Sequence, residues 1–184
     1  MSRWLDADEA HGELLASGPS AVLRYHRALD EVRVLRAAAL VGLAHQSIEI
    51  GARYAKERRA FGVPIGTYQG VAHPLADAVV AADGAELLTW KACWALDEGA
   101  VEAPALASMA LVFAGQTAYQ ASQHSLHIHG GYGFTAEYDI QLYYRRAKAW
   151  LTAFADPGRE LRVLADRRFG PARQRLAGEV QAAP

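Results

Sequence analysis

The feature that most constrains this chain is a long stretch, residues 28–62, in which apolar side chains recur at the period of an α-helix. Glycine and proline end it in the run FGVPIG, because Gly62, Pro64 and Gly66 stop helix propagation. Arginines occupy other positions around the same turns. The pattern predicts one long helix, with apolar residues at Leu29, Val32, Leu35, Ala39, Leu43 and Ile48.

Three further segments are expected to be helical. Residues 67–100 predict a second helix, which has Pro74 in its first turns and Gly99 at its end. Residues 103–130 are rich in alanine and carry no charged side chain, which predicts a third helix that is buried on most sides. A fourth helix is expected over residues 136–154.

A short fifth helix is expected over residues 159–169, and strand alternation is nowhere sustained. Helices joined by short loops pack antiparallel to their neighbours. The sequence therefore predicts an all-α fold, an antiparallel helical bundle over residues 22–184. Residues 1–21 lack a clear period, and we expect them to form an N-terminal arm or the remnant of something larger.

The composition indicates one compact domain and disfavours several classes of protein and partner. The chain has 184 residues, 52% of them hydrophobic, which is enough for one compact domain. A net charge of -1 and a pI near 6.7 favour neither nucleic acid nor an anionic membrane surface as a partner. The lone Cys93 excludes an internal disulfide, and charged residues interrupt every run that approaches the roughly 20 apolar residues of a membrane span. We expect a cytoplasmic protein.

A glycine-rich segment, HIHGGYGFTAEYDIQ, follows the third expected helix. His127 and His129 are two residues apart, whereas metal ligands on one helix face are three or four apart, so no metal site is expected there. Gly130, Gly131 and Gly133 follow a helix rather than a strand, which argues against a dinucleotide-binding fingerprint. Taken alone, the glycines favour the close approach of a crossing helix over that of a flat ligand.

The stretch KERRAFG, residues 56–62, places basic side chains at the C-terminal end of the first helix. There they stabilise the helix dipole, and this role is sufficient for Lys56 and Arg59. Arg58 and Phe61 also suit a second role, in which a guanidinium binds an anionic group and an aromatic ring packs beside it.

General acid–base catalysis needs a carboxylate whose pKa is raised by an apolar environment. No acidic residue is singled out by its sequence neighbours, and the sequence has no recognisable nucleophile elbow or Ser/His/Asp arrangement. The catalytic residues therefore remain unknown, and the carboxylates considered are Glu31, Glu49, Glu137 and Asp156.

The order of three motifs resembles the C-terminal helical domain of acyl-CoA dehydrogenases. The motifs are ERRAFG, the glutamine Gln69 that follows it, and HGGYGFTAEYD, and the resemblance covers about residues 29–166. In that family FAD lies between subunits, and the C-terminal domain of one chain contacts the FAD held mainly by its neighbour. The resemblance therefore implies FAD as a cofactor that is shared with a partner chain.

The matching positions imply a set of cofactor contacts. Arg58 matches the arginine that touches the FAD pyrophosphate, Phe61 matches the aromatic residue beside it, and Gln69 matches the glutamine that follows. Gly130 and Gly131 match the backbone near the adenosine end of the cofactor. The glycine segment would then contact a flavin dinucleotide through its backbone.

Several positions depart from the family pattern. His127 replaces a glutamine that usually precedes the glycine pair, and its imidazole can still donate a hydrogen bond to a flavin group. Ala60 replaces a glutamine and cannot donate. The catalytic glutamate of the family would fall at about Phe154 or Val32, and the family's N-terminal helical and middle β-domains are not matched.

The resemblance implies a truncated subunit that is not a complete catalyst. It would complete the FAD site of a full-length or complementary acyl-CoA dehydrogenase subunit, in a homo- or hetero-oligomer whose partner chain carries out α,β-dehydrogenation. One alternative is a stand-alone helical-bundle enzyme for a non-redox reaction on a carrier-bound or polyketide-like intermediate, with His127 and His129 as acid–base groups. Another is a purely structural oligomer or a decayed gene product.

Overall fold

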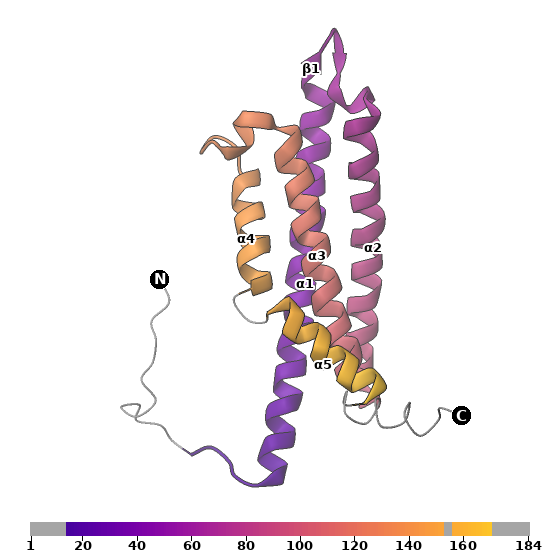
Figure 1. Cartoon of the computed structure of the whole chain (residues 1–184), viewed down its shortest axis with the longest axis vertical. Helices are drawn as coiled ribbons and strands as arrows, with labels where there is room; N and C mark the ends of the chain where they lie inside the picture. Colours follow the sequence, from indigo (N-terminus) through magenta and orange to yellow (C-terminus); the bar gives the residue numbers. More distant parts are fainter. Residues whose placement is uncertain (1–13, 153–155, 171–184) are drawn as a thin grey trace, which may run out of the picture.

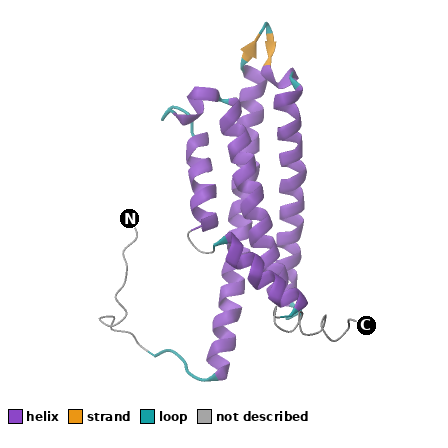
Figure 2. Cartoon of the chain, in the orientation of Figure 1, coloured by secondary structure: helices purple, strands orange, loops and turns teal. Residues whose placement is uncertain are grey.

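The computed structural model describes residues 14–152 and 156–170. In this part of the chain the fold is an up-and-down arrangement of long helices, with a two-stranded hairpin at one end (Figure 1, Figure 2). The elements in chain order are α1 (Pro19–Glu57), β1 (Arg59–Ala60), β2 (Val63–Pro64), η1 (Ile65–Thr67), α2 (Gln69–Asp97), α3 (Ala103–Ile128), η2 (Gly130–Phe134), α4 (Ile140–Thr152) and α5 (Pro157–Phe169).

The predicted all-α class and antiparallel bundle are confirmed. Helix α3 is the central element, because it contacts α1, α2, α4 and α5 and buries residues along most of its circumference. Short 3-10 segments and the hairpin make the connections at the upper end in Figure 1. None of the described helices combines the length and the apolar character that crossing a membrane requires. Cytoplasmic localisation stays a prediction.

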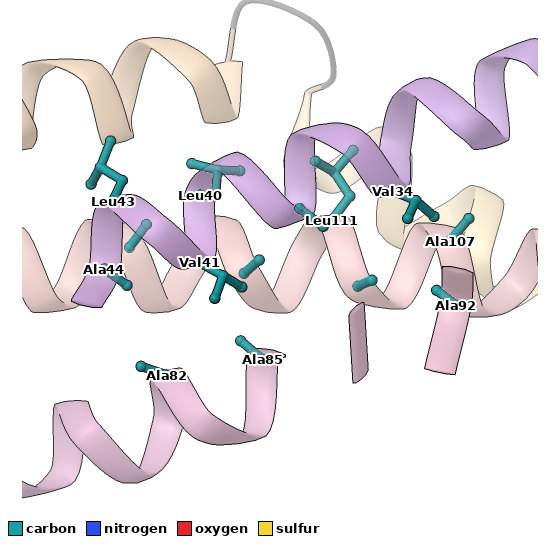
Figure 3. Close-up of a cluster of buried hydrophobic side chains, with 14 of the residues drawn as sticks. Val34, Leu40, Val41, Leu43, Ala44, Ala82, Ala85, Ala92, Ala107 and Leu111 are labelled. Atoms are coloured by element: carbon teal, nitrogen blue, oxygen red, sulfur yellow. The ribbon is translucent and has the colours of Figure 1, made fainter. Parts of the chain in front are cut away.

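The core is built largely from alanine, with a few larger aliphatic residues. Small side chains let helix backbones approach closely, so α1, α2 and α3 pack in one layer with little space between them. Figure 3 shows this layer, to which α1 contributes Val34, Leu40 and Val41 and α3 contributes Ala107 and Leu111. Each of these five residues has less than a tenth of its surface exposed.

Not all of the apolar positions that predicted the first helix belong to this core. Leu43 and Ile48 are buried, whereas Val32, Leu35 and Ala39 are exposed. The apolar period indicated the helix correctly, but α1 is apolar over more of its circumference than its neighbours cover. The choice of buried face depends on which helices pack against it.

Helices α1 and α3 approach closely near their shared upper end. A Cβ added to Gly51 of α1 would overlap the side chain of Ser125 on α3. The Ser125 hydroxyl donates a hydrogen bond to the Ser47 carbonyl across the interface, at 2.6 Å. A buried hydroxyl needs such a partner, and this hydrogen bond links the two helices.

Helix α5 is held against α1 and α3 by a network of buried charges. Arg33 donates to both carboxylate oxygens of Glu160, at 2.9 and 3.0 Å, and to Asp30 at 3.0 Å. Arg167 donates to Asp30 at 2.7 Å and to the Pro104 carbonyl at 2.6 Å. Burial alone would lower the pKa of Arg33, but these carboxylates outweigh it and raise that pKa above its ordinary value.

The helix boundaries agree with the predicted ones to within a few residues, except at the start of the first helix. Helix α1 begins at Pro19 rather than at residue 28, where the first helix was expected to start, and its first turns are exposed. Residues 1–13 lie outside the described residues, so the predicted N-terminal arm stays a prediction.

Candidate functional site

The site residues expected from the sequence gather at one end of the bundle. The hairpin after α1, the first turn of α2, the last turn of α3 and the η2 segment all lie at the upper end in Figure 1. Helices α1 and α3 run in the same direction, because α2 returns the chain between them, so the C-terminal ends of α1 and α3 lie at the same end of the bundle (Figure 1). The hairpin and the glycine segment, about seventy residues apart in sequence, therefore lie at the same end of the bundle. The cofactor contacts predicted for this end are Arg58, Phe61, Gln69, His127, Gly130 and Gly131.

The hairpin presents an aromatic side chain in an unusual backbone conformation. Strands β1 and β2 pair with Ala60 opposite Val63, which leaves Phe61 and Gly62 as a two-residue turn. Both have positive φ, 52° and 83°, as type I′ turns require. Positive φ costs a non-glycine residue about 1–2 kcal/mol. The Phe61 side chain is also 97% exposed, so packing within the described chain does not offset this cost.

Two hydrogen bonds hold the turn in place. Arg59 donates from its guanidinium to the Gly62 carbonyl at 3.0 Å, across the hairpin. The Tyr68 hydroxyl donates to the Ala60 carbonyl at 3.1 Å and so ties the hairpin to the start of α2. The exposed Phe61 ring is therefore carried on a braced turn rather than on an unsupported loop.

Arg58 differs from its neighbour Arg59, because its guanidinium does not hydrogen-bond to the hairpin in the described part of the chain. Its backbone N–H caps α1 by donating to the Tyr54 carbonyl at 2.8 Å. The guanidinium is exposed and has no hydrogen-bond or ion-pair partner within residues 14–152 and 156–170. Gln69, the first residue of α2, is likewise exposed. An uncompensated guanidinium beside an exposed aromatic ring suits an anionic ligand that also has a flat apolar part.

The glycines after α3 have different roles. Gly130 has φ +61°, a conformation that favours glycine, and it turns the chain away from the helix. A Cβ added to Gly133 would meet the Leu126 carbonyl at 2.7 Å, so this glycine is required by packing. A Cβ on Gly130 or Gly131 would meet no described atom within 4 Å. The expectation that a crossing helix explains the Gly130–Gly131 pair is therefore wrong, because both glycines face open space.

His129 joins the glycine segment to the last turn of α1. Its ring is 3% exposed and stacks on Tyr54, with centroids 3.9 Å apart, while the edge of Tyr138 packs at 5.3 Å. Its Nδ1 lies 2.6 Å from the Ser125 carbonyl and donates to it. Burial lowers the pKa of His129, which favours the neutral imidazole. The cluster places residue 129 against the last turn of α1, one turn before Arg58.

This aromatic cluster was not found from the sequence. Tyr54 and Tyr138 are unremarkable in their local segments, and only the packing of α1 on α3 brings them to His129. The neighbouring His127 is exposed, so the two histidines do not act on one ligand. Their rings lie on different sides of the helix end, as the spacing of two residues predicts.

The carboxylates considered as acid–base groups have ordinary environments. Glu31 and Glu49 are exposed and pair with arginines one turn away, Arg27 and Arg53. A hydrogen bond from the Thr135 side chain lowers the pKa of Glu137, opposite to what a general base requires.

Asp156 is the N-cap of α5, where its carboxylate accepts the Arg159 N–H at 2.7 Å. Of the two positions that correspond to the family's catalytic glutamate, Val32 carries an aliphatic side chain, and Phe154 lies outside the described residues. Val32 instead lines an apolar groove of about 310 Å³ between α1 and α4, together with Leu35, Ala39 and Trp150.

The comparisons with known proteins agree on one family. The model of the acyl-CoA dehydrogenase C-terminal domain matches residues 23–153. Glutaryl-CoA dehydrogenase of Desulfococcus multivorans is 34% identical over 122 residues, which cover 66% of this chain and 31% of that protein. Acyl-CoA dehydrogenase IpdE2 of Mycolicibacterium smegmatis is 32% identical over 135 residues, 73% of this chain and 42% of that protein.

The fold gives the same result. The solved glutaryl-coenzyme A dehydrogenase glutaryl-CoA complex superposes with a TM-score of 0.75 at 30% identity, covering 79% of this chain and 37% of that one. The chain thus spans about a third of the length of the relatives it matches first. Proteins of this family are FAD-dependent and form oligomers and complexes. The chain belongs to the acyl-CoA dehydrogenase family and corresponds to the C-terminal helical domain of its members.

Proposed function

We propose that this chain is a subunit of a flavin-dependent acyl-CoA α,β-dehydrogenase, in which it completes the FAD site of a partner chain. The observation that carries the proposal is the hairpin, where Phe61 is 97% exposed at positive φ and follows Arg58, whose guanidinium has no partner among the described residues. Backbone strain persists where the surrounding structure or the function requires it. Here the strained residue is almost fully exposed within the part of the chain that the structure describes, so we infer that its use lies in contact with another molecule.

The exposed end of the bundle has the groups that a dinucleotide needs. The Arg58 guanidinium would neutralise pyrophosphate charge, and the Gln69 amide would orient the dinucleotide by hydrogen bonding. Open space over Gly130 and Gly131 lets a flat ligand approach the backbone, and the His127 imidazole can donate a hydrogen bond. When bound, FAD would accept the hydride that leaves the acyl thioester.

The proposal assigns proton abstraction to the partner. The apolar groove between α1 and α4 is lined by no carboxylate among the described residues, and Val32, about where the family's glutamate would fall on α1, lines it instead. Catalysis by this chain alone would need such a base within reach of the substrate. The matched region covers only 31% and 42% of the lengths of two relatives. This supports an active site that needs parts of the protein beyond the C-terminal helical domain.

Exposed apolar side chains on α2 support association with another chain. On the outer side of α2, Val80, Leu87, Trp90 and Trp94 are all more than half exposed, at 72, 71, 65 and 56%. Their spacing of three, four and seven residues places them in one stripe along the helix. Clustered exposed tryptophan and leucine side chains mark a protein interface rather than a solvated surface.

The visible absorbance spectrum tests the proposal. The chain is purified alone and after co-expression with a dehydrogenase-like chain encoded beside it, and flavin is expected only in the complex. Arg58→Ala should reduce flavin retention by the complex, whereas Arg53→Ala, an exposed arginine on the same helix, should not. A complex that forms without flavin, or that keeps its flavin fully in Arg58→Ala, would contradict the proposal.

The rival acid–base role for His127 and His129 lacks geometric support. His129 is buried between two tyrosines and bonded to a backbone carbonyl, while His127 is exposed on another side of the helix end. A flavin-independent activity that disappears in His127→Ala would favour that rival.

A further inference from the structure

A cluster of possible metal ligands lies between α1 and α2, away from the hairpin end. It consists of His45 on α1 and of Asp83 and Glu86 on α2. The His45 Nε2 is 3.2 Å from a carboxylate oxygen of Glu86, and one ligand atom from each of the three residues lies within 4.8 Å of the other two. His45 and Glu86 are half-buried, with 40 and 46% of their side chains exposed.

The two helices hold these side chains in place by simple geometry. Asp83 and Glu86 are three residues apart on α2, so they lie on the same face one turn from each other. His45 lies on the α1 face that meets α2, next to the buried Ala44 and one turn from the buried Val41. On α2 the adjacent Ala82 and Ala85 are fully buried against the same layer. Ligands carried on rigid, packed helices hold their relative positions better than ligands on loops.

The set of donors suits one class of ion. A neutral imidazole and two carboxylates bind zinc and similar transition metals, whereas magnesium and calcium prefer oxygen ligands alone. At zinc–ligand distances of about 2.0–2.2 Å, the ligand atoms of a tetrahedral site lie about 3.4 Å apart. The His45–Glu86 pair is close to this spacing at 3.2 Å, and a ligand atom of the exposed Asp83 lies within 4.8 Å of both.

The surroundings leave space for a fourth ligand. His45 and Glu86 also line a groove of about 280 Å³ between the two helices, which extends past Gly42 and Thr89 toward Cys93. Partial exposure of the cluster allows a water molecule or another ligand to complete the coordination. The bare cluster also brings two carboxylates together, and a dication neutralises their repulsion.

We propose that His45, Asp83 and Glu86 form a binding site for a divalent transition metal, with Zn²⁺ as the ion that fits best. The bound ion links α1 to α2 and stabilises their contact, since it binds the folded arrangement of ligands and not the unfolded chain. No metal site was expected from the sequence, in which His45 lies 41 residues from Glu86, and the two meet only in the folded chain. The inference does not rest on the proposed dehydrogenase function.

Calorimetric titration with Zn²⁺ tests the proposal on the untagged full chain after removal of metals by a chelator. We expect one Zn²⁺ per chain and a melting temperature that rises with Zn²⁺, whereas Mg²⁺ at the same concentration has no effect. His45→Ala and Asp83→Asn should each weaken Zn²⁺ binding at least tenfold. His73→Ala removes an exposed histidine of α2 outside the cluster and should leave binding unchanged.

Asp83 is exposed, so Asp83→Asn keeps the test valid even if His45→Ala perturbs folding. Circular dichroism and the melting temperature without metal check the fold of each variant. Absence of Zn²⁺ binding by the natural chain would overturn the proposal. So would unchanged affinity in Asp83→Asn, because the binding would then be adventitious at other surface groups.

Discussion

The charge network under α5 gives the most quantitative prediction for the stability of this fold. Asp30 is 3% exposed and accepts hydrogen bonds from Arg33 at 3.0 Å and from Arg167 at 2.7 Å. Charge-assisted hydrogen bonds of this kind contribute about 1.5–3 kcal/mol each. We predict that Asp30→Ala lowers the free energy of unfolding by about 3 kcal/mol, the lower end of their sum.

The lower end applies because neither arginine is left without a partner. Arg33 keeps both hydrogen bonds to Glu160, and Arg167 keeps the Pro104 carbonyl and the Ser108 hydroxyl. For a chain of this size, 1 kcal/mol corresponds to about 2–4 °C in melting temperature. Asp30→Ala should therefore lower the melting temperature by about 6–12 °C.

The neighbouring Glu31 supplies the matched control. Its side chain is 53% exposed and pairs with Arg27 across one helical turn at 3.3 Å. Such exposed pairs contribute about 0.5 kcal/mol or less, so Glu31→Ala should leave stability nearly unchanged. Urea unfolding of all variants at one fixed protein concentration provides the measurement. Equal destabilisation by Asp30→Ala and Glu31→Ala would refute the reasoning, because the buried network would then contribute no more than a surface ion pair.

Three further predictions concern the hairpin and the glycine segment. Phe61→Gly relieves the positive φ without loss of packing, so the isolated chain should keep its stability to within about 1 kcal/mol in urea, while flavin retention by the complex falls. Gly133→Ala should destabilise the chain by about 1–3 kcal/mol in the same assay, because its Cβ would meet a carbonyl at 2.7 Å, whereas Gly131→Ala should not. Burial lowers the pKa of His129, so the unfolded chain binds this proton first and stability should fall as pH drops below about 6.5 toward the folded-state pKa. Unfolding measured across this pH range should show a shallower slope in His129→Gln than in the natural chain, and an identical slope would count against the burial argument.

Most of the secondary structure could be predicted because it depends on local properties. The run FGVPIG predicted a stop to the first helix, and α1 ends at Glu57, shortly before that run, while Gly99 with φ 63° follows the end of the second helix. The uncharged, alanine-rich third helix has the composition of a buried element, and α3 is the central helix. The cofactor residues expected from the family motifs lie at one end of the bundle, and their contacts with FAD stay a prediction.

The sequence by itself determined the helices, their order and the family, because periodicity, helix-ending residues and motif spacing are local properties of the sequence. Only the tertiary structure decided which side of α1 is buried, since Val32 and Leu35 are as apolar as Val34 and Leu40. It also brought Arg167 to Asp30, Glu86 to His45 and Tyr54 to His129, pairs whose members lie 41 or more residues apart. Hydrogen bonds and ring contacts act over a few ångströms in space, so residues distant in sequence meet only after the helices have packed.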